Sequence, residues 1–214
     1  MIEKSEIQLE LAGGRSAQAY LAASEAAGPG VLVLHAWWGL NAFFRDVCDR
    51  LASEGFTALA PDLYQGHIAQ TVEQAEEMLS LERDNIELLE DIVQAGLLRL
   101  AAITGGGGLG VMGFSMGAYW SMAAAARNPK VKAVVLFYGT AGVDYSKVGA
   151  AVQGHFAEND PYESPEGVRE MQNDLEAAGV PASFHTYPGT SHWFMETDRP
   201  QFDAGAAEAA WDRT

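Results

Sequence analysis

A serine stands between two glycines in the segment Gly113-Phe114-Ser115-Met116-Gly117, which has the form G-x-S-x-G. The apolar run Leu109–Met112 precedes this segment, and Ala118–Arg127 behind it has the composition of a helix. A strand, a sharp turn and a helix are the context in which this motif exposes a nucleophilic serine. The turn strains the serine backbone, and glycines let strand and helix approach closely. The sequence therefore predicts that Ser115 is a nucleophile.

A serine hydroxyl needs a base to accept its proton, and the base needs an acid to orient it. His192 lies in a turn-rich loop, residues 188–194, directly after the expected last strand, which is the place for a base in this arrangement. His35 and His67 precede Ser115 in the chain, which is the wrong order. His155 and His185 lie inside strand-like runs. We therefore expect His192 to be the base.

Asp160 is the candidate for the acid. It follows the expected strand Ala151–Phe156, and the Pro161 behind it indicates the start of a loop. Glu158 is the rival, although it stands closer to the strand end, and a turn or helix-capping role is the alternative for Asp160 itself. We expect Asp160, with the serine and the histidine, to complete a Ser-His-Asp catalytic triad.

A tetrahedral intermediate needs two backbone N–H donors, one from the residue after the nucleophile and one from the loop after an earlier strand. The first is Met116, and Trp37 is the best candidate for the second. Trp37 and Trp38 could also form a wall of the acyl pocket, and core packing at this strand-to-helix corner is the alternative for both. We add Trp38 and Trp193 as candidate substrate contacts.

The elements that must position these residues alternate between strand and helix nearly from end to end. The expected strands are Ile7–Leu11 and Ala17–Ala22, which form a hairpin, then Val31–Ala36, Thr57–Ala60, Leu109–Met112, Val131–Tyr138, Ala151–Phe156 and Ala182–Tyr187. The expected helices are Asn41–Ser53, Val72–Leu81, Ile86–Ile103, Ala118–Arg127, Pro165–Ala178 and Pro200–Trp211. This alternation predicts an α/β fold with a mostly parallel central sheet flanked by helices on both faces.

Composition limits the classes of function. With 214 residues, 48% of them hydrophobic, the chain can form one substantial core, and we expect a single domain over residues 1–214. A formal net charge of −16 argues against binding to nucleic acid or to anionic membranes. The only cysteine, Cys48, falls on the apolar face of an expected helix and is interpreted as a core residue. The charged N-terminus is unlike a secretory signal, so we expect a cytoplasmic protein.

The chain resembles the dienelactone hydrolase family, which has the α/β-hydrolase fold. The resemblance runs over about residues 30–195 and is carried by His35–Asn41, Arg45-Asp46, Leu51–Gly55, Ala58–Gly66, Gly113–Gly117 and the loops with Asp160 and His192. It implies a hydrolase that cleaves a small carboxylic ester or lactone through an acyl-enzyme, without a metal or an organic cofactor. A monomer or a small homo-oligomer is expected. The alternatives are an acyltransferase or amidase with the same triad, or a binding protein that has lost the chemistry.

Two differences from the family bear on the substrate and the nucleophile. The members that cleave dienelactone carry a cysteine where this chain has Ser115 and a glutamate, which helps to activate that cysteine, where it has Ala36. Both differences favour a serine esterase. The resemblance also implies arginines that bind a substrate carboxylate, one of them shortly after the catalytic histidine, where this chain has Glu196. Arg83 remains a candidate contact, and a solvated surface charge is its alternative.

Overall fold

The computed structural model describes residues 2–25, 28–83 and 85–214, and the side chains of residues 81–83 lie outside that description. Over the described residues, eight strands form one sheet in the order β1-β2-β4-β3-β5-β6-β7-β8. The pair β3 and β4 and the set β6, β7 and β8 are parallel, whereas β1 and β2 are antiparallel. This confirms the expected α/β fold with a mostly parallel sheet.

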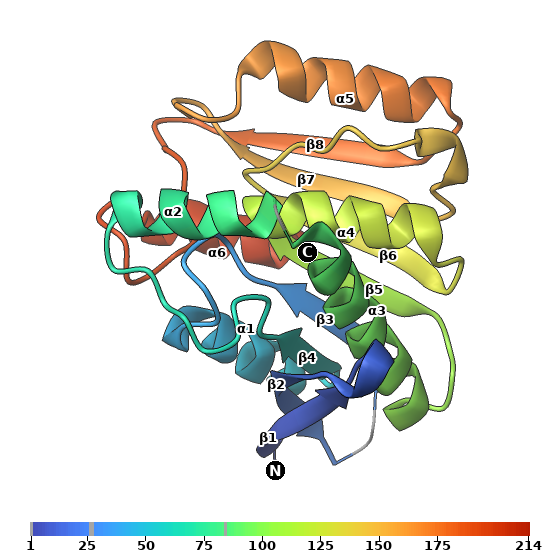
Figure 1. The fold of residues 1–214 in the computed structure, drawn as a ribbon. Coiled ribbons are helices and arrows are strands. Elements are labelled where there is room, and N and C mark those ends of the chain that lie inside the picture. Colours follow the sequence, from blue (N-terminus) through green and yellow to red (C-terminus); the bar gives the residue numbers. More distant parts are fainter. Residues whose placement is uncertain (1, 26–27, 84) are drawn as a thin grey trace. The chain divides into compact units, whose positions relative to one another are not determined.

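Strands and helices alternate along the chain (Figure 1). The strands are β1 (Ile2–Glu10), β2 (Ser16–Ser24), β3 (Gly30–Leu34), β4 (Thr57–Pro61), β5 (Leu109–Phe114), β6 (Val131–Phe137), β7 (Ala151–Ala157) and β8 (Ala182–Tyr187). The helices are α1 (Ala42–Ser53), α2 (Val72–Arg83), α3 (Ile86–Ile103), α4 (Met116–Arg127), α5 (Pro165–Ala177) and α6 (Ala204–Arg213), with short 3-10 turns at Ala12–Gly14 and Tyr145–Lys147. Every expected element is present. The opening hairpin is longer than expected, and the last helix starts later.

The late start of α6 corrects the expected helix Pro200–Trp211. Oδ1 of Asp203 accepts a hydrogen bond of 2.9 Å from the N–H of Ala206, so Asp203 caps the helix. Ahead of this cap the chain forms turns, in which the N–H of Phe202 donates to the carbonyl of Arg199. The apolar spacing continues across the cap, and for this reason it did not reveal the true start.

The chain divides into two compact units, Met1–Gly110 and Val111–Thr214. The expectation of a single domain stays a prediction. In the first unit, β3 and β4 are almost entirely buried, which is typical of parallel strands covered on both faces. Helix α1 begins after Asn41, whose side chain accepts the N–H of Phe44, and it turns Phe44, Val47 and Cys48 into the core. Cys48 is fully buried, which agrees with its interpretation as a core residue.

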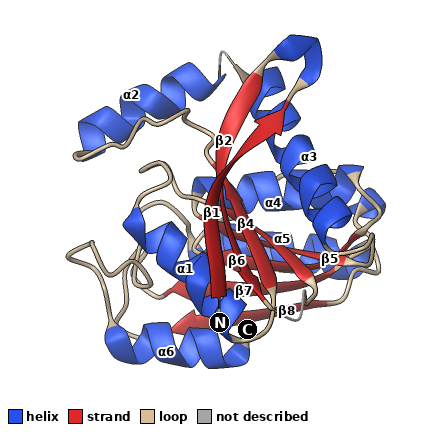
Figure 2. Cartoon of the chain, turned by 90° about the horizontal axis from the view of Figure 1, so that it is seen from below, coloured by secondary structure: helices blue, strands red, loops and turns tan. Residues whose placement is uncertain are grey.

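In the second unit, α4 packs on β6 and α5 packs on β8. The end of α6 contacts β7 and β8: Nε2 of Gln153 in β7 donates to the carbonyl of Arg213 at 2.9 Å, and the Arg213 guanidinium lies over the ring of Tyr187 at the end of β8. Figure 2 shows α6 on the face of β7 and β8 opposite to α4 and α5. Helices therefore lie on both faces of this part of the sheet, and because β6, β7 and β8 are parallel, the loops that follow them leave at one edge of the sheet.

Candidate active site

Ser115 occupies the turn between β5 and α4. Its backbone has φ 52° and ψ −114°, a combination that is strained for a residue with a Cβ atom. Two hydrogen bonds fix this backbone conformation. The Ser115 N–H donates to the carbonyl of Phe137 at 2.9 Å, and the Ser115 carbonyl accepts the N–H of Ala118 at 2.8 Å. The side chain is therefore fixed above the end of β5, as the motif predicted.

Glycines make this tight turn possible. A Cβ atom on Gly113 would lie 2.1 Å from the carbonyl oxygen of Gly117 and 2.3 Å from Oγ of Ser121, so the strand and the helix could not approach as they do. A Cβ atom on Gly139, after β6, would lie 2.6 Å from the carbonyl oxygen of Ser115. The first glycine belongs to the motif, and the second supports the same turn from the neighbouring strand.

The structure brings Ser115, His192 and Asp160 together. Nε2 of His192 lies 2.9 Å from Oγ of Ser115, and Nδ1 lies 2.7 Å from Oδ2 and 2.9 Å from Oδ1 of Asp160. The side chains of His192 and Asp160 are both almost fully buried. Because a carboxylate only accepts, Nδ1 of His192 carries the proton and Nε2 is free to accept the serine proton. This is the geometry that a general base requires.

The loop after β7 fixes the carboxylate. Oδ1 of Asp160 also accepts the N–H groups of Tyr162 at 2.9 Å and Glu163 at 3.1 Å, which orients the carboxylate toward His192. The rival Glu158 is exposed, and its Oε2 accepts the N–H of Gly189 at 2.8 Å instead. Glu158 thus ties the loop after β7 to the loop after β8, while Asp160 faces the imidazole.

Three aromatic rings surround the imidazole of His192. Their centroids lie 4.8 Å (Tyr162), 5.0 Å (Tyr138) and 5.1 Å (Trp193) from that of the imidazole. Tyr138 is fully buried, whereas about half of Tyr162 is exposed. Trp193, a predicted substrate contact, therefore lies beside the site. Sequence reasoning missed both tyrosines, although Tyr138 is the last residue of the expected strand Val131–Tyr138 and Tyr162 directly follows the Asp160-Pro161 turn.

The structure gives less detail on the other predicted site residues, which are Met116, Trp37, Trp38 and Arg83. Met116 is the first residue of α4 and directly follows Ser115. Trp37 and Trp38 follow β3 in the first unit, where both are buried and pack edge to face. Met116 and Trp37 belong to different units, and their pairing as an oxyanion hole stays a prediction. The side chain of Arg83 lies outside the described residues.

His35, which precedes Trp37, has a structural role in the first unit. Its Nδ1 lies 2.7 Å from the carbonyl oxygen of Ala36, and its Nε2 accepts the N–H of Leu63 at 3.1 Å. Both contacts suit a neutral imidazole, and complete burial lowers the pKa of His35. His35 therefore ties the loop after β3 to the loop after β4, which agrees with its exclusion as the base.

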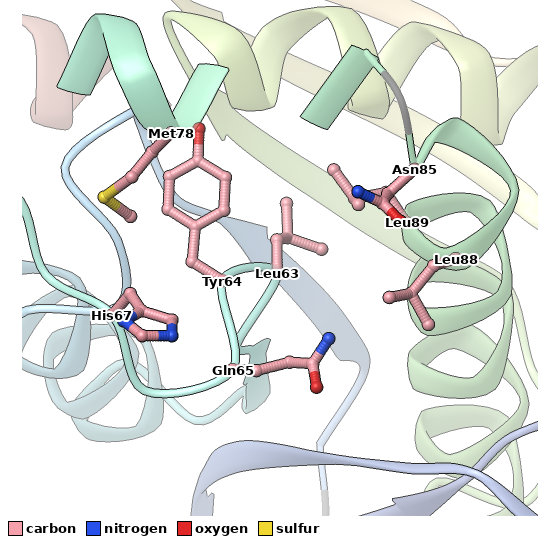
Figure 3. A pocket seen from close by; sticks show the side chains of 8 residues that line it. All are labelled: Leu63, Tyr64, Gln65, His67, Met78, Asn85, Leu88 and Leu89. Carbon is pink, nitrogen blue, oxygen red and sulfur yellow. The ribbon is translucent and has the colours of Figure 1, made fainter. Parts of the chain in front are cut away.

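A cavity of about 410 Å³ lies in the first unit. It is lined by Leu63, Tyr64, Gln65, His67, Met78, Asn85, Leu88 and Leu89. In Figure 3, side chains from the start of α3 face those of the loop after β4 across it. Its size and mostly apolar lining suit a small organic molecule. No local sequence pattern marks this cavity, because it forms between segments that meet only in the fold.

Two further observations concern the described parts of the chain. No helix there is long and apolar enough to cross a membrane. Nor does any group of three or more His, Cys, Asp or Glu side chains among those residues have an arrangement that could hold a metal ion.

Comparison with known proteins points to one family. Residues 17–214 match the sequence pattern of the dienelactone hydrolase family. A protein of Aquifex pyrophilus called usf is 30% identical over 212 residues, which cover 94% of this chain and 92% of that protein. A protein of Aquifex aeolicus (strain VF5) named "Putative carboxymethylenebutenolidase" is 29% identical over 210 residues, covering 93% and 91% of the two chains.

A solved structure agrees with these sequence matches. The crystal structure of a "Putative Dienelactone Hydrolase" from Klebsiella pneumoniae subsp. pneumoniae MGH 78578 superposes with a TM-score of 0.85 at 26% identity. The superposition covers 100% of this chain and 96% of that one. The similarity therefore extends over both compact units.

Proposed function

This chain belongs to the dienelactone hydrolase family and is a hydrolase, and we propose that it cleaves carboxylic esters or lactones through an acyl-enzyme on Ser115. The observation that supports this most strongly is the chain of contacts from Asp160 through His192 to Oγ of Ser115, with the proton of the imidazole on the side of the carboxylate. A serine in a strained turn, an oriented base and a buried acid are what nucleophilic catalysis requires.

In the proposed reaction, Nε2 of His192 accepts the proton of Ser115 as Oγ attacks the ester carbonyl. Asp160 stabilises the imidazolium that forms, and the N–H groups of Met116 and Trp37 stabilise the oxyanion. His192 then gives its proton to the leaving alcohol oxygen as the carbon–oxygen bond breaks. A water molecule, deprotonated by His192 in the same way, attacks the acyl-enzyme and releases the acid.

The proposal predicts that Ser115→Ala abolishes turnover of an activated short-chain ester such as p-nitrophenyl acetate. By analogy with triad variants on other folds, we expect a loss on the order of 10⁴-fold. The circular dichroism spectrum should stay unchanged, because Ser115 is only partly buried and the substitution removes a single oxygen atom. Near wild-type activity in this variant would show that the nucleophile is another residue.

Treatment with a fluorophosphonate provides a second test that needs no knowledge of the natural substrate. We expect one stable adduct on the wild-type chain, located at Ser115 by peptide mass spectrometry, and none on Ser115→Ala. Acyl transfer and amide cleavage would use the same three residues. Product analysis with competing alcohols or amines distinguishes these reactions from hydrolysis.

A further inference from the structure

A buried carboxyl group lies close to His192 without belonging to the triad. Glu196 stands in the turn that follows the histidine, where its N–H donates to the carbonyl of Trp193 at 2.9 Å. Its side chain is completely buried, and Oε1 accepts a hydrogen bond of 2.9 Å from the phenol of Tyr138. Oε2 is also buried and has no hydrogen-bond partner among the described residues.

Tyr138 connects this carboxyl group to the imidazole. Its ring packs against that of His192 at 5.0 Å and against that of Phe194 at 5.5 Å. Its backbone has a φ of 39°, which is unusual for a residue with a bulky side chain, and its N–H donates to the carbonyl of His155 at 2.7 Å. Strained positions of this kind persist where the surroundings demand one side-chain placement.

The geometry gives Tyr138 a defined task. The hydrogen bond to Asp160 fixes Nδ1 of His192 but leaves the ring free to rock about that nitrogen, so that Nε2 would move relative to Oγ of Ser115. The Tyr138 ring fills the space on one side of the imidazole. The bond from its phenol to Glu196 prevents the Tyr138 ring from moving away, because Glu196 is anchored in the same turn as the histidine.

Fold stability alone does not explain Glu196. A buried carboxyl group with one hydrogen bond is costly, and an apolar side chain of similar size would fill this space at a lower cost. Burial raises the pKa of Glu196 to about 8, so at neutral pH the group is mostly protonated. In that state Oε1 can accept the hydrogen bond from the Tyr138 phenol without placing a second negative charge near the imidazole.

We propose that Tyr138 and Glu196 are a positioning pair, which holds the imidazole of His192 in line between Asp160 and Ser115. The inference rests on the proposed function for its effect on the rate, but the contacts that carry it do not depend on which substrate is cleaved. Neither residue touches the reacting atoms, and both act through the histidine. A displacement of the base by about 1 Å can cost about 100-fold in rate.

The test measures the rate at which a fluorophosphonate labels Ser115, followed by intact mass. We expect Tyr138→Phe and Glu196→Leu each to slow labelling by about tenfold, and the double variant to be no slower than either single variant, because both break one connection. Glu196→Gln keeps an oxygen that can accept the hydrogen bond from the Tyr138 phenol. Ser115 in this variant should therefore be labelled within about twofold of the wild-type rate. Tyr187→Phe is the matched control, because it removes another buried phenol of the same unit that does not contact His192.

The proposal is overturned if Tyr138→Phe labels at the wild-type rate, or if Tyr187→Phe slows labelling equally. An unlabelled wild-type Ser115 would contradict the proposed function instead. The pair is then judged by proton NMR of the Hδ1 atom of His192, which is visible at low field when Nδ1–H is held by Asp160. Broadening or loss of this signal in Tyr138→Phe, but not in Tyr187→Phe, supports the pair, and an unchanged signal overturns it.

Discussion

Cys48 and Ser115 could both act as nucleophiles by residue type, and their surroundings differ. Cys48 is fully buried in α1, and burial raises the pKa of its thiol, so it stays protonated and unreactive. Ser115 lies within hydrogen-bond distance of an oriented base. We therefore predict that Cys48→Ala changes the rates of ester turnover and of fluorophosphonate labelling by less than about twofold. A loss of activity without unfolding would mean that the thiol takes part in the reaction.

That Ser115, His192 and Asp160 lie together could be predicted from the sequence, because each position carries a local signal. Ser115 has a motif, Asp160 begins a loop after a strand, and His192 follows the last strand. Tyr138 and Glu196 carry no such signal, since their roles arise from contacts between loops far apart in the sequence. Residue types are therefore a better guide to the groups that react than to the groups that hold them in place.

At the level of elements, the connection between β5 and α4 depends on close approach at Gly113. Gly113→Ala would place a Cβ atom 2.1 Å from the carbonyl oxygen of Gly117, so the turn must distort. We predict that this variant is destabilised by about 2 kcal/mol or more and loses most of its fluorophosphonate labelling. Urea unfolding and the labelling rate measure the two effects.

Gly110→Ala is the matched control for this prediction. Gly110 lies in the same strand, but an added Cβ atom would meet its nearest neighbour, Val31 Cγ2, at 3.5 Å, an ordinary contact. Alanine there should therefore change stability and labelling little. Equal losses in both variants would show that the strand, and not the turn, is sensitive to substitution.

Most elements could be predicted because their apolar residues reflect burial that the structure confirms, as continuous runs in β3 and β4 and at helical spacing in α3. The expected and observed bounds differ where hydrogen bonds, and not apolar patterns, decide where an element ends. The start of α6 is fixed by the cap at Asp203, and the opening hairpin continues to Ile2 and Ser24 through pairing between its strands. The fold class thus follows from local patterns, whereas element ends depend on hydrogen bonds that the patterns do not encode.

For the molecule as a whole, buried ionisable groups in both units make stability depend on pH, and His35, His155 and Glu196 are three of them. His35 in the first unit and His155 in the second are buried and neutral, and burial lowers the pKa of His155 from 6.5 to about 3. Glu196 has the opposite behaviour, because burial raises its pKa from 4.5 to about 8. Each group therefore binds a different number of protons in the folded and in the unfolded chain.

The signs follow from these differences. Below pH 6.5 the unfolded chain takes up protons on both histidines before the folded chain does, so these two groups make the free energy of unfolding decrease as the pH falls. Between pH 4.5 and 8 the folded chain keeps a proton on Glu196 that the unfolded chain has lost, so the free energy of unfolding decreases as the pH rises. Each proton contributes about 1.4 kcal/mol per pH unit. Two histidines outweigh one glutamate below pH 6.5, and the glutamate acts alone above it.

We therefore predict that stability, measured by urea unfolding at a series of pH values, is greatest near pH 6.5. Variants separate these groups from the acidic surface, which contributes equally to variant and wild type. Glu196→Gln should match the wild type at pH 5 and exceed it by a growing margin up to pH 8.5, because its amide cannot ionise. His155→Gln should lose more stability relative to the wild type at pH 7 than at pH 5. At pH 5 the wild type is itself destabilised, because its unfolded chain takes up a proton on His155, and the variant is free of this effect. If both margins are independent of pH, buried Glu196 and His155 do not keep the protonation states that their surroundings impose.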